Sequence, residues 1–160
     1  MADELNERQI CNKPIDILLV EDNEADVKIT LRAFAKVRLK NNIYVVHDGE
    51  EALDFIYHEG KYQDKNKFPK PNLILLDIKL PKLDGFQVLE KLKNDLQYNF
   101  IPVIMLTSSK DEEDVARSYR SGAASFIPKP VSYEDFVKVV DGFSVYWYTI
   151  NKLPNPNMPI

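Results

Sequence analysis

The chain has 160 residues, of which 44% are hydrophobic and 29% charged, with a formal net charge of -4. This is the composition of an ordinary globular protein, and a domain of this length buries roughly 70% of its unfolded surface, so it needs no covalent staples. The lysines are scattered among acids and form no basic stripe, which argues against nucleic-acid binding. The only cysteine, Cys11, excludes an internal disulfide framework.

No apolar run in the sequence reaches the length of a membrane span, and the N-terminal stretch MADELNERQ is polar and acidic, unlike a signal peptide. We therefore expect a cytoplasmic protein with neither a membrane nor a nucleic acid as its partner.

Strand-like and helix-like patterns alternate along the chain. Short apolar runs predict strands, and apolar residues spaced three to four apart predict helices. In chain order the predicted elements are strand 15–20, helix 24–37, strand 43–46, helix 50–57, strand 73–77, helix 86–94, strand 101–106, helix 112–122, strand 124–128 and helix 132–148. Gly122 is expected to cap the fourth helix, and Ser132 with Asp135 resembles a capping box at the start of the last.

Five strands that alternate with five helices predict an α/β fold with a parallel sheet covered on both faces. Right-handed crossovers leave few topologies, and we expect the flavodoxin-like, doubly wound strand order 2-1-3-4-5. The predicted domain spans residues 15–150, between a flexible N-terminal tail over 1–14 and an irregular, proline-rich tail over 151–160.

Polar residues that could bind a ligand or take part in a reaction follow four of the strands. Glu21 and Asp22 follow the first strand, Asp77 ends the third, Thr107 follows the fourth, and Lys129 follows the fifth between two prolines. Ligands of such sheets bind outside the carboxyl ends of the strands. The first and third strands are neighbours in the expected order, so we expect the three carboxylates to converge.

Converging carboxylates repel, because two unit charges about 4 Å apart cost on the order of 4 kcal/mol at an effective dielectric of 20. Oxygen ligands without histidine or cysteine favour a hard cation, and Mg²⁺ is the expected one. A carboxylate beside Mg²⁺ can act as a nucleophile toward phosphorus, with Lys129 and Thr107 placed to bind the phosphoryl oxygens. A single aspartate after a strand is usually a turn or cap residue, but four strand ends agree here.

The segments ILLVEDNEADV, LILLDIKLPKLDGFQVL, IPVIMLTSS and GAASFIPKP resemble the signature segments of two-component response regulator receiver domains. The resemblance covers residues 15–148 and is closest to the single-domain regulators of phytochrome-type histidine kinases. Those regulators also carry a long segment before the third strand and an extended C-terminus.

The resemblance implies that Asp77 accepts a phosphoryl group from a histidine kinase or a phosphotransfer protein. It further implies that Asp22 and Asp77 bind Mg²⁺ through their side chains, Lys79 through its backbone carbonyl, and Glu21 through a metal-bound water. Lys129 would pair with the phosphoryl group, and the bond between Lys129 and Pro130 would be cis, as is usual in the family.

Two further residues carry the expected response to phosphorylation. By resemblance, Thr107 is the switch hydroxyl and Phe126 the switch aromatic whose rotamer follows it. Many relatives carry a smaller or neutral residue in place of Lys79, which leads to the hypothesis that this lysine alters the lifetime of the phosphorylated state.

Three other features have weaker meaning. His47 and His58 lack the spacing of metal ligands, so surface roles are expected. The stretch 58–72 is longer than the usual connection of about 2–6 residues and is either a solvated loop or a partner contact. Four aromatic residues near the C-terminus exceed what one helix stripe can bury, which favours a homodimer through the last helix: Phe143, Tyr146, Trp147 and Tyr148.

The leading interpretation is a phosphorylation-dependent binding module rather than an enzyme, with no activity beyond self-catalysed phosphoryl acceptance and autodephosphorylation. No output domain is expected, so the signal should leave by protein contact with an unknown downstream partner. A haloacid-dehalogenase-type phosphatase would need an acid where Lys79 stands, and a nucleotide-binding protein would need a glycine-rich loop that is absent. A receiver that no longer accepts phosphate is the third alternative, against which the complete acid, hydroxyl and lysine set argues.

Overall fold

The computed structural model describes residues 14–36, 40–129, 132–145 and 156. Five strands lie within this part of the chain: β1 (Ile15–Val20), β2 (Asn41–Val46), β3 (Leu73–Leu76), β4 (Val103–Thr107) and β5 (Ser125–Pro128). They alternate with five α-helices and one short 3₁₀ helix: α2 (Glu24–Lys36), α3 (Gly49–Tyr57), η1 (Gly60–Tyr62), α4 (Gly85–Lys93), α5 (Glu112–Arg120) and α6 (Tyr133–Val145).

The strands form one parallel sheet in the order β2-β1-β3-β4-β5, as the alternation of elements predicted. The register brings Val20 of β1 opposite Val46 of β2 and Leu76 of β3. Every residue of β3 and β4 is buried, which explains why these strands are read as continuous apolar runs in the sequence. Their carboxyl ends meet at one edge of the sheet.

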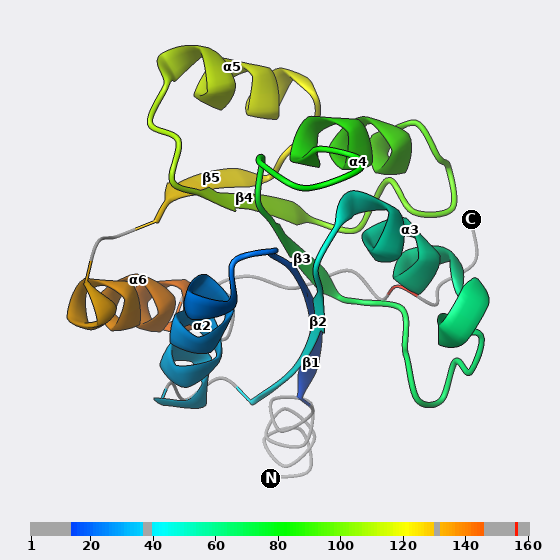
Figure 1. Ribbon diagram of the computed structural model, residues 1–160, viewed down its shortest axis with the longest axis horizontal. Helices are drawn as coiled ribbons and strands as arrows, with labels where there is room; N and C mark the ends of the chain where they lie inside the picture. Colours follow the sequence, from blue (N-terminus) through cyan, green and yellow to red (C-terminus); the bar gives the residue numbers. More distant parts are fainter. Residues whose placement is uncertain (1–13, 37–39, 130–131, 146–155, 157–160) are drawn as a thin grey trace, which may run out of the picture.

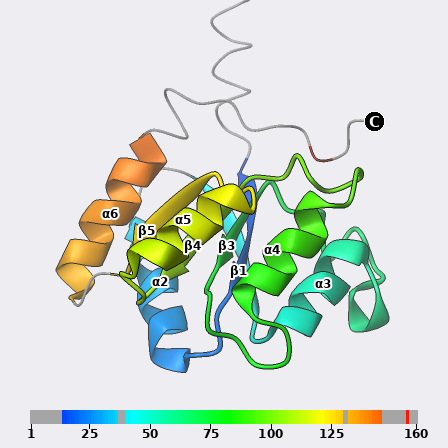
Figure 2. The ribbon, with the colours of Figure 1, turned by 90° about the horizontal axis from the view of Figure 1, so that it is seen from above.

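Helices cover both faces of the sheet (Figures 1 and 2). On one face, α2 and α6 lie side by side and enclose a core built from alternate strand residues with Phe34, Phe136 and Val140. On the other face, α3 and α4 enclose a second core with Phe55 and Leu89, and α5 lies beside α4 over β4 and β5. The two close-packed cores hold the strands in place, so the residues at the strand ends have fixed positions relative to one another.

Helix ends follow the signals in the sequence. Asp84 accepts a hydrogen bond from the backbone N–H of Gln87 at 2.9 Å, and the Gln87 side chain accepts one from the N–H of Asp84, which completes a capping box for α4. Ser132 accepts a bond from the N–H of Asp135 at 3.2 Å before α6. Gly122 has φ of +99° just after α5, a conformation in which glycine avoids the strain of a side chain.

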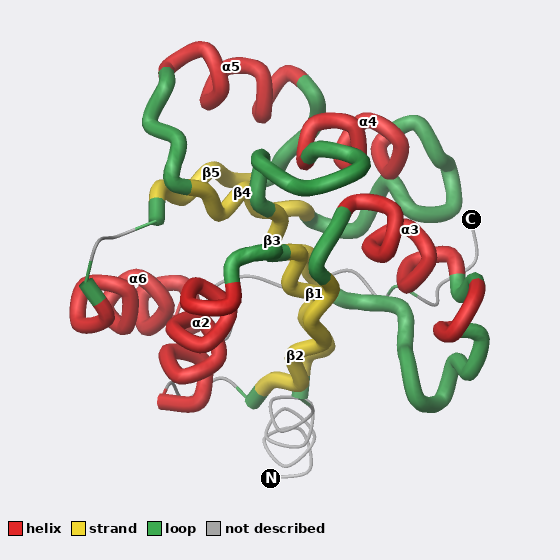
Figure 3. Tube along the Cα trace, in the orientation of Figure 1, coloured by secondary structure: helices red, strands yellow, loops and turns green. Residues whose placement is uncertain are grey.

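The stretch 58–72 is not simply a solvated loop, although much of it is exposed. It begins with η1 and folds back on α3 (Figure 3). Tyr62 is buried, and its ring lies 5.0 Å from that of Phe55 and 4.9 Å from that of Phe68. His58, with φ of 56°, ends α3, and its Nε2 lies 2.8 Å from the carbonyl oxygen of Phe68. The insertion is therefore an ordered, aromatic extension of the core.

Several expectations fall on residues outside the described part of the chain. These are the cis bond before Pro130, most of both tails, and the four aromatic side chains near the C-terminus: Phe143, Tyr146, Trp147 and Tyr148. The domain limits of 15–150 therefore remain a prediction. Among the helices of the described part, none is long and apolar enough to cross a membrane.

Candidate functional site

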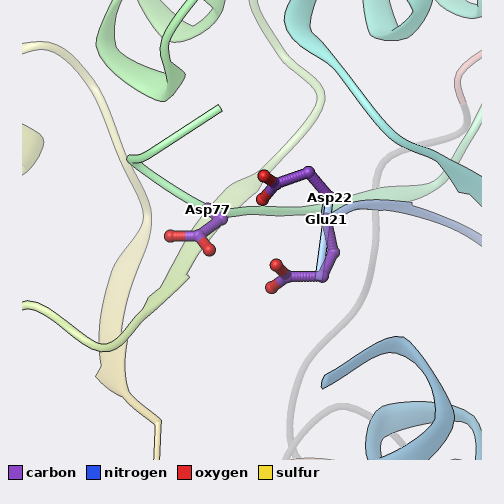
Figure 4. A group of neighbouring side chains, drawn as sticks. All are labelled: Glu21, Asp22 and Asp77. Atoms are coloured by element: carbon purple, nitrogen blue, oxygen red, sulfur yellow. The ribbon is translucent and has the colours of Figure 1, made fainter. Parts of the chain in front are cut away.

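The ends of β1 and β3 bring three carboxylates together (Figure 4). Glu21, Asp22 and Asp77 each offer an oxygen atom, and these atoms lie within 4.8 Å of one another. Glu21 and Asp77 are only 2% and 7% exposed, whereas Asp22 is exposed. The expected convergence of the three acids is confirmed.

Lys129 reaches this group from the end of β5. Its backbone N–H donates to the carbonyl oxygen of Thr107 at 2.7 Å, which fixes the start of the side chain at the end of β4. Its Nζ donates to Glu21 Oε2 and, at 3.0 Å, to Asp77 Oδ2. A third carboxylate, that of Asp26 in the first turn of α2, also accepts from Nζ at 3.0 Å.

The charges in this cluster perturb one another. Burial and, to a smaller extent, the nearby charge of Asp77 together raise the pKa of Glu21 to about 7, against the lowering effect of Lys129. Burial alone would lower the pKa of Lys129, but its hydrogen bond to Glu21 and the charges of Asp77 and Glu21 outweigh this and raise it. Lys129 therefore stays protonated. It is one cation among four acids, so the cluster retains excess negative charge.

The two oxygens of Asp77 have different surroundings. Oδ2 is held by Lys129, whereas Oδ1 is buried and has no hydrogen-bond partner in the described part of the chain. A buried acceptor without a partner costs about 1–3 kcal/mol, so such an atom is expected to have a ligand in the working protein. An all-oxygen donor set with excess negative charge fits a hard divalent cation.

The loop after Asp77 is fixed by backbone contacts. The N–H of Asp77 donates to the carbonyl of Val20 at 3.2 Å, and the N–H of Gly85 donates to the carbonyl of Ile78 at 2.8 Å. Lys79 is exposed, and no hydrogen bond or ion pair joins its side chain to the described residues. The ammonium that contacts Glu21 is that of Lys129.

Thr107 and Phe126, the two residues of the expected switch, lie on the neighbouring strands β4 and β5. Thr107 is fully buried at the end of β4, next to the end of β3, and among the described residues its Oγ1 accepts only a long bond, from the N–H of Ser109 at 3.4 Å. Phe126 is half-buried in β5 and packs against the core on the α4 side of the sheet. Its backbone N–H donates to the hydroxyl of Tyr119 at 3.2 Å.

The contact between Asp26 and Lys129 could not be predicted from the sequence. An acid in the first turn of a helix is ordinarily a partner of the helix dipole, and that explanation needs nothing else. Its contact joins residues 103 positions apart, so only the fold shows it.

Comparison with known proteins shows the family of this chain. The response regulator receiver domain family matches residues 17–141. Response regulator Rcp1 of Synechocystis sp. is 36% identical over 143 residues, which cover 89% of this chain and 95% of Rcp1. The crystal structure of the Mn²⁺-bound form of Rcp1 covers 89% of this chain and 100% of its own, with a TM-score of 0.80 at 35% identity.

Two further solved structures are similar. The phosphorylated cyanobacterial phytochrome response regulator RcpA has a TM-score of 0.82 at 34% identity and covers 89% of this chain and 100% of its own. The bacteriophytochrome response regulator AtBRR has a TM-score of 0.69 at 42% identity and covers 88% of this chain and 99% of its own. Such domains bind a divalent cation and take a phosphoryl group from a histidine kinase onto an aspartate. This chain belongs to the response regulator receiver domain family.

Proposed function

We propose that Asp77 is the phosphoacceptor, and that it takes its phosphoryl group from a phosphohistidine of a sensor histidine kinase or a phosphotransfer protein. One observation carries the assignment. Asp77 Oδ1 is buried without a hydrogen-bond partner among the described residues, while Oδ2 is held 3.0 Å from Lys129 Nζ. The side chain is thereby oriented and keeps one oxygen available.

The reaction is a direct displacement at phosphorus. A carboxylate oxygen of Asp77 forms a bond to phosphorus, the bond from phosphorus to the histidine nitrogen breaks, and that nitrogen retains the electron pair and takes up a proton. The product is an acyl phosphate. Lys129 lies beside the acceptor and can exchange its bond to Asp77 Oδ2 for one to a phosphoryl oxygen, which stabilises the transferred charge.

The residues present fit Mg²⁺ as the cation of this site. Asp22 and Asp77 would hold it through side chains, Lys79 through its backbone carbonyl, and Glu21 through a bound water. When bound, the ion neutralises charge on the transferred group. The protein's own residues orient Asp77, bind the phosphoryl oxygens and keep the carboxylates in place.

The signal would follow from a change at Thr107. Within the described part of the chain its hydroxyl has one long bond to release before it can turn toward the phosphoryl group, and Phe126 on the neighbouring strand would follow into the vacated space. Catalysis is then limited to self-catalysed phosphoryl acceptance and autodephosphorylation. Output would occur through protein contacts in the cytoplasm, with no part for nucleic acid or membrane.

The relatives named above support a phytochrome-type kinase as the partner, since RcpA and AtBRR are described as phytochrome and bacteriophytochrome response regulators.

A homodimer through the last helix, suggested by its aromatic residues in the sequence, completes the proposal. Sedimentation with and without a phosphoryl mimic tests it, and a monomer under both conditions at high concentration would exclude it.

Acetyl phosphate and Mg²⁺ test the central assignment. The wild-type chain should gain the mass of one phosphoryl group, and Asp77→Asn should gain none. Asp64→Asn is the matched control, because Asp64 lies in an exposed part of the insertion and, among the described residues, its side chain bonds only the backbone N–H groups of Asn66 and Lys67. A wild-type chain that gains no mass from this donor or from a cognate kinase would instead support a receiver that has lost phosphoryl acceptance.

A further inference from the structure

Lys129 has three ammonium protons and meets three carboxylates, of which only two belong to the proposed cation site. We propose that Asp26 holds the Lys129 ammonium among the carboxylates and thereby sets the concentration of divalent cation at which the site is occupied. The inference rests on the proposed function, in which Glu21, Asp22 and Asp77 form a cation site. It assigns a positioning function to a residue outside that site.

The contacts divide cleanly. Nζ of Lys129 donates to Glu21 and Asp77, two of the three acids whose oxygens converge. It donates also to Asp26 Oδ2 at 3.0 Å, and Asp26 is not one of the three. The ammonium and a divalent cation therefore compete for the oxygens of Glu21 and Asp77. Asp26 contacts the ammonium but does not belong to the proposed cation site.

Asp26 is well held for this task. Its backbone N–H donates to Asn23 Oδ1 at 3.1 Å, and its carbonyl accepts from the Thr30 hydroxyl at 2.8 Å, so the first turn of α2 fixes its position. Its side chain is 37% exposed, whereas that of Lys129 is 11% exposed. The contact is thus partly shielded from water, and it is stronger there than an ion pair in open solvent.

Two effects of Asp26 oppose each other. As a negative charge near the site it attracts any cation, but as a direct partner of Lys129 it stabilises the arrangement in which the ammonium occupies the cluster. The direct bond to Lys129 outweighs the longer-range attraction for a divalent cation, because an attraction across solvent is largely screened and a partly buried, hydrogen-bonded pair is screened much less. Removing Asp26 should therefore weaken the binding of the Lys129 ammonium to the cluster more than it weakens the binding of a divalent cation. The affinity of the site for the divalent cation should rise as a result.

Glu24 supplies a matched control. It lies in the same first turn of α2 and carries the same charge, but its side chain is 71% exposed and its ion-pair partner is His47, at 3.9 Å. Glu24→Gln removes one negative charge near the site without touching Lys129. It should leave Mg²⁺ affinity unchanged or slightly weaker.

The test is the dissociation constant for Mg²⁺, measured by titration calorimetry on the full chain. Asp26→Asn and Asp26→Ala should bind Mg²⁺ about three- to fivefold more tightly than wild type, and Glu24→Gln should not. Equal or weaker binding in both Asp26 variants would overturn the inference. Thermal melts accompany each titration, since a merely structural function of Asp26 would lower stability without tightening cation binding.

A second background makes the test independent of folding effects. In Lys129→Met there is no ammonium to anchor, so adding Asp26→Asn should now weaken Mg²⁺ binding slightly, as Glu24→Gln does. Tighter binding in that background would overturn the inference, since the effect would not pass through Lys129. A wild-type chain that takes a phosphoryl group while its Asp26 variants bind Mg²⁺ no more tightly would refute this inference and leave the proposed function standing. A wild-type chain that binds no Mg²⁺ would refute both.

Discussion

Gly85, the first residue of α4, lies against the backbone of Asp77. A Cβ atom built on Gly85 would stand 2.2 Å from the carbonyl oxygen of Asp77 and 2.8 Å from the Cα of Ile78. Contacts this short with backbone atoms cannot be relieved by a side-chain rotation. The start of α4 and the proposed phosphoacceptor are therefore packed as one unit, and glycine is required because of close approach rather than because of its φ angle.

Gly85→Ala should displace the Asp77 loop or unfold it. We expect a loss of about 1–3 kcal/mol in the free energy of unfolding, the usual cost of overpacking, together with slower phosphorylation of the folded fraction. Urea denaturation and acetyl phosphate labelling measure the two effects. Gly142→Ala in α6 is the control, because a Cβ there meets nothing within 4 Å, and it should raise stability by up to about 1 kcal/mol. Equal stability of Gly85→Ala and wild type would contradict the packing argument.

Lys79→Asn should shorten the lifetime of the phosphorylated state several-fold. The Lys79 side chain is exposed, two residues beyond Asp77, and is not engaged by the described residues, so it can extend toward a phosphoryl group and crowd the attacking water. Dephosphorylation after removal of the donor measures the lifetime. Lys82→Asn is the control, since the Lys82 ammonium already pairs with two carboxylates, those of Asp48 at 3.5 Å and Glu50 at 3.8 Å. An unchanged rate in Lys79→Asn would disprove the hypothesis.

Thr107→Val should separate phosphorylation from the response of Phe126. The variant keeps the branched shape at a fully buried position but removes the hydroxyl. We expect phosphorylation to persist while the ring resonances of Phe126 no longer shift on addition of beryllofluoride, as followed by NMR of phenylalanine-labelled protein. Ser108→Ala, at an exposed neighbour, should retain the shift. A full shift in Thr107→Val would exclude the hydroxyl as the switch.

Tyr62→Phe should destabilise the chain most strongly between pH 4.5 and 10. The Tyr62 hydroxyl donates to Glu51 Oε1 at 2.5 Å, a bond to a charged acceptor worth about 1.5–3 kcal/mol. Urea denaturation across the pH range measures the difference from wild type. Tyr44→Phe is the control, because Tyr44 packs on the same Phe55 ring, at 5.4 Å, and its hydroxyl has no hydrogen bond in the described part of the chain.

The pH limits follow from the two partners. Burial and the bond to Glu51 raise the pKa of Tyr62 from 10.0 to about 12, so this contribution is complete below pH 10 and is lost as pH rises toward 12. Burial would raise the pKa of Glu51, but its bonds from Tyr62, His47 and Lys61 outweigh this and lower it. Its contribution is therefore present above pH 4.5 and is lost as pH falls below that value. A difference independent of pH would contradict this account.

Much of the fold could be predicted because local patterns and global topology agree. The strand at 15–20 was predicted with its observed limits, since β1 is bounded by Pro14 and the acids Glu21 and Asp22. The fourth strand was predicted to begin at residue 101 but begins at Val103, because the N–H of Ile101 bonds the carbonyl of Tyr98 and Pro102 has no N–H to give. The carboxylates could be predicted to converge because parallel strands end at one edge.

Two features could not be predicted from the sequence. The polar composition of residues 58–72 concealed Tyr62 and Phe68, whose rings pack against each other and against the buried ring of Phe55 in α3. Nothing in the sequence indicates that Asp26 contacts Lys129, because only the fold places the residue after β5 beside the first turn of α2. Periodicity shows which face of an element is apolar, but not which distant charge a polar side chain will meet.

The most direct measurement locates the phosphoryl group. Protein incubated with acetyl phosphate and Mg²⁺ is reduced with borohydride, which converts an aspartyl phosphate to homoserine, and is then cleaved with trypsin. The peptide 68–79, FPKPNLILLDIK, contains Asp77 as its only carboxylate side chain. The proposed function predicts that the homoserine lies in this peptide at position 77 and nowhere else, whereas an unmodified peptide alongside a phosphorylated chain would contradict it.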